Sequence, residues 1–151
     1  MDSSFMVRAI ELAKKACDLG EIPVGAVVVK NGRIIGEGYN MRESKNLLIS
    51  HAEIEAINSA NKTLGDWRLE GATIYVTLEP CLMCAGAIAD SRIKEIVFGA
   101  YDLERGFVSS KADIGSLTKR DISVFAGIKE NECKALLDSF FSKVREKNGE
   151  L

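Results

Sequence analysis

Hydrophobic residues recur at helical spacing near both ends of the chain. Near the N-terminus they predict an amphipathic helix over residues 6–17, which Gly20 ends. The same spacing over residues 133–144 predicts a closing helix, and the basic residues that follow suit the negative end of its dipole. Apolar residues also repeat with this period in the middle of the chain. They predict one helix that begins near His51 and another over residues 81–90.

Five short segments have the composition of β-strands. Residues 24–29 and 33–37 flank Asn31-Gly32, a dipeptide typical of a two-residue hairpin turn. Residues 72–78, 93–100 and 122–125 predict three more strands, whereas residues 40–50 show no steady period and residues 101–121 are expected to be irregular. Because helices separate the later strands, crossover connections are required. We therefore expect an α/β fold with one mixed five-stranded sheet covered by helices on both faces.

Length and composition narrow the class of protein. A chain of 151 residues fits a single domain, so we expect one domain over residues 1–151. With 46% apolar and 28% charged residues, the composition excludes general disorder. The apolar stretches are shorter than the roughly 20 residues that cross a bilayer, and residues 1–4 do not begin a secretory signal, so we expect a cytoplasmic protein. A net charge of −2 gives no general reason to expect nucleic-acid binding.

The candidate chemistry lies in two short motifs. His51-Ala52-Glu53 contains the chain's one histidine, and Glu79-Pro80-Cys81-Leu82-Met83-Cys84 follows downstream. A lone histidine is most often structural, and a Cys-x-x-Cys pair occurs in redox sites as well as in zinc sites. The two remaining cysteines are isolated on helix faces, which excludes a closed zinc site of four thiolates. A thioredoxin-like redox site stays open on position alone, since the pair follows a strand and begins a helix.

Together the motifs supply one imidazole and two thiolates, from His51, Cys81 and Cys84. Three such ligands leave the fourth tetrahedral position of zinc open to water, which is typical of a catalytic site. Two thiolates neutralise the formal charge of Zn²⁺, so water is acidified less than at an all-histidine site and a nearby carboxylate is needed. Glu53, two residues after His51, is placed to move protons without binding the metal. We therefore expect one zinc ion per chain.

The combination of His-x-Glu and Pro-Cys-x-x-Cys resembles the signature of the zinc-dependent nucleobase deaminases. Within that family, nearly the whole chain resembles the tRNA-specific adenosine deaminases. The similar segments are residues 21–26, 38–40, 51–54, 75–81, 84–88, 91–93 and 132–141. This resemblance implies a three-layer fold like that of cytidine deaminase and a homodimer. It also implies that the substrate is a tRNA anticodon loop, whose wobble adenosine becomes inosine.

The resemblance also implies roles for individual residues. The zinc ligands and the proton shuttle are the residues already singled out, namely His51, Cys81, Cys84 and Glu53. Asn40 would contact the base, Ala52 would offer it a backbone N–H, and Ile22 would form part of the pocket wall. Taken alone, two of these residues allow other interpretations. Asn40 would simply end a strand, because Asn favours turns, and Ile22 would belong to the core.

Two segments depart from the pattern of tRNA-acting relatives. Residues 107–120 lack their usual Gly-Ser and Asn-His positions, and residues 47–50 replace the common Asp-Pro-Thr-Ala. The departures leave open a deaminase of a free nucleobase or nucleoside such as guanine or cytosine. A zinc-bearing structural or RNA-binding subunit is a further alternative, although such a subunit has no need for Glu53. Basic residues that could contact phosphate are Lys111, Lys119, Arg120, Lys143, Arg145 and Lys147.

Overall fold

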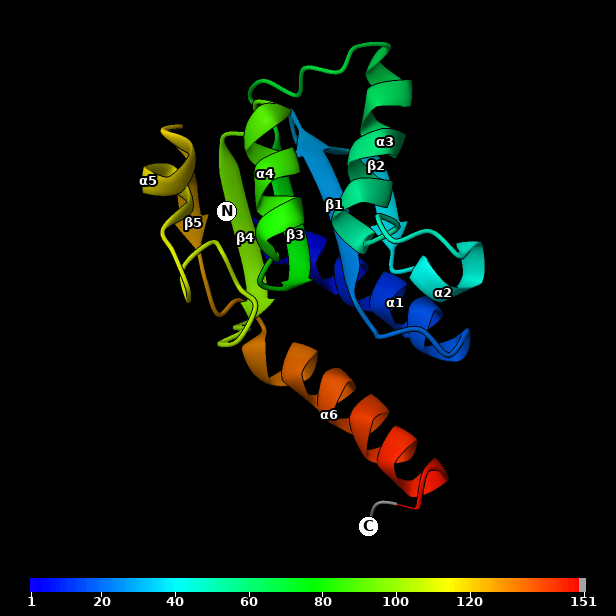
Figure 1. Cartoon of the computed structure of the whole chain (residues 1–151). Coiled ribbons are helices and arrows are strands. Elements are labelled where there is room, and N and C mark those ends of the chain that lie inside the picture. Colours follow the sequence, from blue (N-terminus) through cyan, green and yellow to red (C-terminus); the bar gives the residue numbers. More distant parts are fainter. Residues whose placement is uncertain (150–151) are drawn as a thin grey trace.

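A five-stranded mixed sheet forms the centre of the molecule, in the order β2-β1-β3-β4-β5 (Figure 1). The computed structural model describes residues 1–149, so residues 150–151 of the expected domain lie outside the described residues. The strands are β1 (Gly25–Lys30), β2 (Arg33–Tyr39), β3 (Thr73–Leu78), β4 (Glu95–Ala100) and β5 (Ser123–Phe125). β1 pairs antiparallel with β2 and β3, while β4 pairs parallel with β3 and β5. The expected mixed sheet is confirmed.

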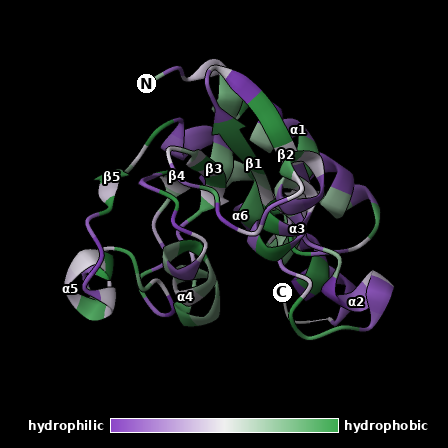
Figure 2. Cartoon of the chain, turned by 90° about the horizontal axis from the view of Figure 1, so that it is seen from above, coloured by the Kyte–Doolittle hydropathy of each residue, from purple (hydrophilic) through white to green (hydrophobic). Residues whose placement is uncertain are grey.

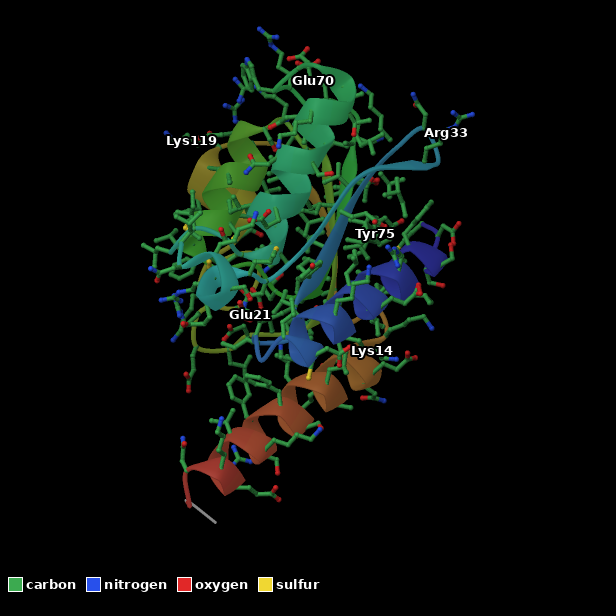
Figure 3. The ribbon with its side chains drawn as sticks, turned by 90° about the vertical axis from the view of Figure 1, so that its right-hand side faces the viewer. Lys14, Glu21, Arg33, Glu70, Tyr75 and Lys119 are labelled. Atoms are coloured by element: carbon green, nitrogen blue, oxygen red, sulfur yellow. The ribbon has the colours of Figure 1, made fainter. Side chains whose placement is uncertain are left out.

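The hairpin of β1 and β2 turns at Asn31-Gly32, as its sequence predicts. Both residues have positive φ, 52° and 73°, which is the conformation of a type I′ turn. Figure 3 shows Arg33 at the tip of this hairpin. Further along β2, a Cβ at Gly36 or Gly38 would collide with the backbone of the helix that follows His51. These glycines therefore let that helix lie directly on the strand.

Helices cover both faces of the sheet (Figures 1 and 2). One face packs against α1 (Ser4–Asp18) and α6 (Glu130–Lys147), and the other against α3 (Ala52–Leu64), α4 (Leu82–Asp90) and α5 (Ile114–Thr118). Neighbouring residues of β1 face opposite cores, since Val28 packs with α3 and α4 while Val27 packs with α1. Within residues 1–149, no helix is long and apolar enough to span a membrane.

Two one-turn helices lie where the sequence predicted irregular structure. They are α2 (Arg42–Lys45) and α5, and a single turn is too short to show a hydrophobic period. The start of α5 is fixed by Asp113, whose side chain accepts a hydrogen bond from the Ser116 N–H. The predicted closing helix is present, but Cys133 is its one buried residue within the described chain. Leu136 and Leu137 also pack against the core, and the apolar side chains from Leu137 onward are available to line a cavity.

Candidate active site

The N-termini of two neighbouring helices bring the sequence motifs together. His51 occupies the N-cap of α3, and Cys81 occupies the N-cap of α4. Cys84 is the third residue of α4, one turn further on. The two helices contact each other on one face of the sheet (Figure 1). The positive ends of both helix dipoles and their first N–H groups therefore surround the thiols, which favours thiolates.

The distances among the three side chains fit a metal ion. Nδ1 of His51 lies 3.7 Å from Sγ of Cys81 and 3.6 Å from Sγ of Cys84. Tetrahedral zinc, with Zn–S bonds of about 2.3 Å and Zn–N bonds of about 2.0 Å, would separate such atoms by about 3.6 Å. A redox dithiol does not require an imidazole equally close to both sulfurs. The group therefore has the donor set and spacing to bind a metal.

The pKa values of the two cysteines are shifted in opposite directions. A hydrogen bond from Cys84, followed by one from His51, lowers the pKa of Cys81 to about 3 although burial opposes this. The hydrogen bond to Cys81 and burial both raise the pKa of the Cys84 thiol. The contact with Cys81 also raises the pKa of His51. These contacts favour the thiolate form of Cys81, and a bound cation would favour the thiolate form of both cysteines.

Glu53 brings a buried carboxyl group next to these ligands. It is the second residue of α3 and is only 4% exposed. Burial raises its pKa to about 7, and the negative charge of Cys81 acts in the same direction. Glu53 lines the same cavity as His51 and Cys81 but is not a member of the candidate metal group. Its position suits a group that transfers protons beside a metal ion.

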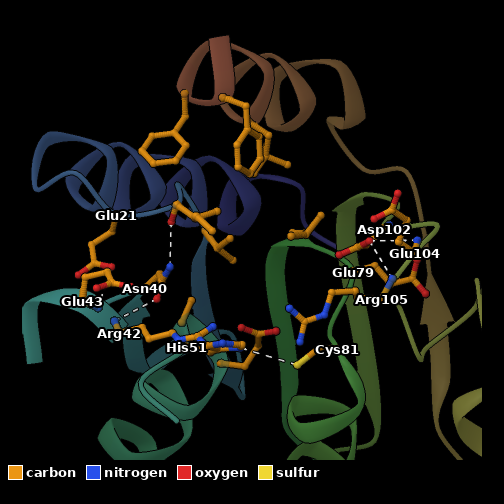
Figure 4. A pocket seen from close by; sticks show the side chains of 18 of the residues that line it. Glu21, Asn40, Arg42, Glu43, His51, Glu79, Cys81, Asp102, Glu104 and Arg105 are labelled. Carbon is orange, nitrogen blue, oxygen red and sulfur yellow. Dashed lines mark hydrogen bonds between the residues drawn. The ribbon is translucent and has the colours of Figure 1, made fainter. Parts of the chain in front are cut away.

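A cavity of about 670 Å³ opens above this group (Figure 4). His51, Glu53 and Cys81 line its floor, and four other segments enclose it. Those segments are residues 20–24, the region around α2, the loop after β4 and the second half of α6. Apart from Ile22 and Asn40, sequence reasoning assigned no site role to their lining residues, which include Arg42, Tyr101, Leu103, Arg105, Leu137, Phe140, Phe141 and Val144. The sequence predicts the aromatic residues of α6 only as part of an apolar helix face, and this period was the signal that could have pointed to them.

The three residues expected to hold the base all line the cavity. Ile22 is 39% exposed, so its interpretation as a core residue is wrong. Asn40 is buried and does follow the end of β2, as its turn preference predicts. Its side chain accepts a hydrogen bond from the Arg42 N–H and donates one to the Ile22 carbonyl. Ala52 is the fully buried first residue of α3. Contacts of these residues with a base stay predictions.

The cations at the cavity differ from those expected. Among residues 1–149, the lining includes none of the six basic residues suggested as phosphate contacts, and contains Arg42 and Arg105 instead. Figure 4 shows the Arg105 side chain reaching into the cavity. Arg42 lies close enough to His51 to lower the imidazole pKa, against the stronger effect of Cys81. Both arginines belong to the walls rather than to the floor. They therefore face the parts of a bound molecule that surround its reacting group.

Comparisons with known proteins agree with this geometry. The family model described as MafB19-like deaminase matches residues 1–145. The tRNA-specific adenosine deaminase of Bacillus subtilis (strain 168) is 46% identical over 97% of this chain and 92% of its own length. A structure from studies of A-to-I editing by tRNA:A34 deaminases superposes with a TM-score of 0.87 and 39% identity. The match covers 90% of this chain and 100% of that one.

A guanine deaminase structure from Bacillus subtilis matches less of the molecule. It is 41% identical with a TM-score of 0.63, and the match covers 67% of this chain and 66% of that one. The fuller matches confirm the expected three-layer fold, with its five-stranded sheet between helices. This chain belongs to the deaminase family that includes the tRNA-specific adenosine deaminases.

Proposed function

We propose that the protein is a zinc-dependent hydrolase that converts the wobble adenosine of a tRNA anticodon to inosine. The observation that carries the proposal is the 46% identity to a tRNA-specific adenosine deaminase over 97% of the chain. In the reaction, water forms a C–O bond at C6 of the base, the C6–N bond breaks, and ammonia leaves. One domain over residues 1–151 would contain the activity, and the substrate implies a cytoplasmic enzyme.

His51, Cys81 and Cys84 would hold the zinc ion, and the fit of their spacing supports this assignment. When bound, zinc lowers the pKa of water and so supplies a nucleophile at neutral pH. Glu53 takes up one proton of the water and delivers it to the ring nitrogen, and it then carries the second proton from the added hydroxyl group to the departing amino group. Its burial keeps these transfers inside the cavity and away from bulk water.

Three residues would position the base beside Glu53. The Asn40 amide is fixed from two sides, by the Ile22 carbonyl and the Arg42 N–H. As the first residue of α3, Ala52 has an N–H that the helix itself does not satisfy, so this group can donate to the base. The exposed side chain of Ile22 offers apolar contact at the cavity wall.

We also propose that two copies of the chain form a homodimer, as the family resemblance implies. The segment before His51 exposes Leu47, Leu48 and Ile49, whose exposed fractions are 52%, 68% and 53%. Contact with a second copy would remove this apolar surface from water. Sedimentation equilibrium of the wild type and of Leu48→Glu tests this. A wild-type monomer at micromolar concentration would contradict it.

A deaminase of a free nucleobase is the second candidate. The likeness to a guanine deaminase structure favours it, as do the departures of residues 47–50 and 107–120 from the tRNA-acting pattern. That likeness extends over 67% of this chain, compared with 97% for the tRNA-specific relative. A non-catalytic zinc subunit is disfavoured, because it would have no use for a buried carboxyl group beside the ligands.

Ammonia release by the purified, zinc-loaded protein distinguishes these functions. The substrates to compare are an anticodon stem-loop with adenine at the wobble position, free adenosine, cytosine, cytidine, guanine and guanosine. We expect release from the stem-loop alone, with inosine in the product. Release only from a free base or nucleoside would keep the chemistry and overturn the substrate. Binding of zinc and RNA without turnover would indicate the subunit.

Replacement of Glu53 tests the proton transfer. Glu53→Gln keeps the size of the side chain but cannot accept the proton, so turnover should fall by about 100-fold to 10,000-fold. Zinc content and melting temperature should stay at wild-type values. Glu55→Gln is the matched control on the same helix, where Glu55 pairs with Lys45 at 2.9 Å. The control should retain activity within about twofold. Retained turnover in Glu53→Gln would reject the role.

A further inference from the structure

The loop of residues 101–110 forms one wall of the cavity without being a helix or a strand. Its residues 101–105 all line the cavity, and they include Tyr101, Leu103 and Arg105. Leu103 is 74% exposed and Tyr101 is 44% exposed. Apolar burial of these side chains therefore contributes little to holding the wall in place. Val108, which is 1% exposed, anchors the far end of the loop in the core. The part that lines the cavity requires another source of order.

That source is the carboxylate of Glu79, which lies under the loop and is 2% exposed. Oε1 accepts hydrogen bonds from the Asp102 N–H at 3.1 Å and from the Ser110 hydroxyl. Oε2 accepts from three consecutive backbone N–H groups, those of Val108, Ser109 and Ser110, at 3.2, 2.8 and 2.8 Å. All of these partners are donors, so one side chain ties both ends of the loop together.

The middle of the loop is shaped around the same carboxylate. A Cβ at Gly106 would collide with the Glu79 carboxyl carbon and with the carbonyl oxygen of Asp102. The Gly106 N–H donates to that carbonyl at 2.8 Å, and the Phe107 N–H donates to the carbonyl of Pro80 at 3.0 Å. Glu79 and Pro80 directly precede Cys81. The turn that carries a candidate metal ligand therefore also carries the anchor of the wall.

We propose that Glu79 is a positioning residue, which holds the 101–110 loop so that Tyr101, Leu103 and Arg105 receive the nucleotide around the reacting base. The identity of that nucleotide rests on the proposed function. Glu79 contacts the loop and not the reacting atoms. It keeps the wall that surrounds the substrate in a fixed position relative to the floor where the reaction takes place.

Glu79→Gln tests the proposal because an amide nitrogen cannot accept hydrogen bonds from the donors around it. Amides 102 and 108–110 should exchange hydrogen at least about tenfold faster, since a lost bond to a charged group is worth roughly 1.5–3 kcal/mol. KM for the stem-loop should rise at least about tenfold, with a smaller change in kcat and unchanged zinc content. Glu95→Gln makes the same chemical change on β4, where Glu95 accepts from Thr73, and should alter none of these values.

Gly106→Ala gives a second route that leaves every charge in place. Its Cβ forces the loop away from Glu79, so KM should rise in the same way. Because both changes break one contact, the double variant should be no worse than the poorer single variant. The proposal is overturned if amide exchange stays unchanged in both variants. It is also overturned if zinc content and kcat fall while KM does not rise. Amide exchange needs no substrate, so failure of the proposed function would be seen separately.

Discussion

The floor of the cavity and its two side walls are held in different ways. The floor, formed by His51, Glu53 and Cys81, lies at the N-termini of helices that pack on the sheet through buried apolar residues. The walls are the α2 region and the 101–110 loop, which bury few side chains. In each wall, a buried glutamate from a distant part of the sequence accepts several hydrogen bonds. Helix packing therefore fixes the chemistry, and side-chain anchors fix its surroundings.

Glu21 serves the α2 wall as Glu79 serves the other wall. It is 1% exposed and lies below α2, in the region labelled in Figure 3. Its carboxylate accepts hydrogen bonds from the Glu43 N–H at 3.1 Å and from the N–H and hydroxyl of Ser44. Burial opposes ionisation, but these bonds outweigh it and lower the pKa of Glu21. The comparison predicts that damage to the floor abolishes turnover, whereas damage to a wall weakens substrate binding.

The largest effect should follow from damage to the floor. Cys84→Ala removes a buried sulfur that lies 3.6 Å from His51 Nδ1, so the site should lose its zinc. We expect turnover to fall more than about 1000-fold, or about 4 kcal/mol, together with the zinc content. Cys17→Ala, on α1 and outside the candidate metal group, is the matched control and should keep both. A zinc-free Cys84→Ala enzyme with near-normal turnover would contradict the role of the floor.

Local sequence signals were sufficient to predict the floor. The Cys-x-x-Cys spacing at the start of a helix places both sulfurs within one turn, and His51 stands where a second helical period begins. The hairpin followed from Asn31-Gly32, whose turn geometry depends on those two residues. Each of these signals acts over a few residues. The strands, the long helices and the candidate ligands could therefore be assigned before any tertiary contact was known.

The walls could not be predicted, because their contacts join residues far apart in the sequence. Glu21 bonds to residues 22 and 23 positions away, and Glu79 to residues 23–31 positions away. Nothing in the sequence around either glutamate shows that its carboxylate is buried rather than exposed. Glu79 was notable only for its place before Pro80-Cys81. The cavity position of Phe140 and Phe141 likewise depends on where α6 lies against the sheet. A helical period shows that a face is apolar but not what that face contacts.

A smaller effect should follow from damage to the α2 wall. In Glu21→Gln an amide nitrogen faces the donors of Glu43 and Ser44, so the start of α2 should loosen. KM for the stem-loop should rise by about tenfold or less, because fewer bonds are lost than at Glu79. Zinc content should not change. Glu70→Gln is the control, because Figure 3 shows Glu70 near the top of the molecule, well away from Glu21. A loss of zinc in Glu21→Gln would show that this wall and the floor are not separable.

The smallest effect should come from an ion pair outside both regions. Arg8 of α1 donates two hydrogen bonds to Glu37 of β2, at 2.6 and 3.0 Å, and these lower the pKa of Glu37 although burial opposes this. The contribution of these hydrogen bonds to the free energy of unfolding is therefore present at neutral pH. It is lost as the pH falls through the lowered pKa of Glu37. Both side chains are about one-third exposed, at 32% and 35%, so solvent screening limits the contribution to about 0.5 kcal/mol.

Urea unfolding of Glu37→Gln and the wild type should accordingly differ by about 0.5 kcal/mol at pH 7 and converge near pH 3. The same comparison in an Arg8→Gln background should remove the difference at both values of pH, because the partner of the carboxylate is absent. Turnover, KM and zinc content should stay at wild-type values, since neither residue lines the cavity. A change in KM would show that the packing of α1 against β2 affects the walls of the cavity. The floor, the walls and the remaining scaffold could then not be treated as separate regions.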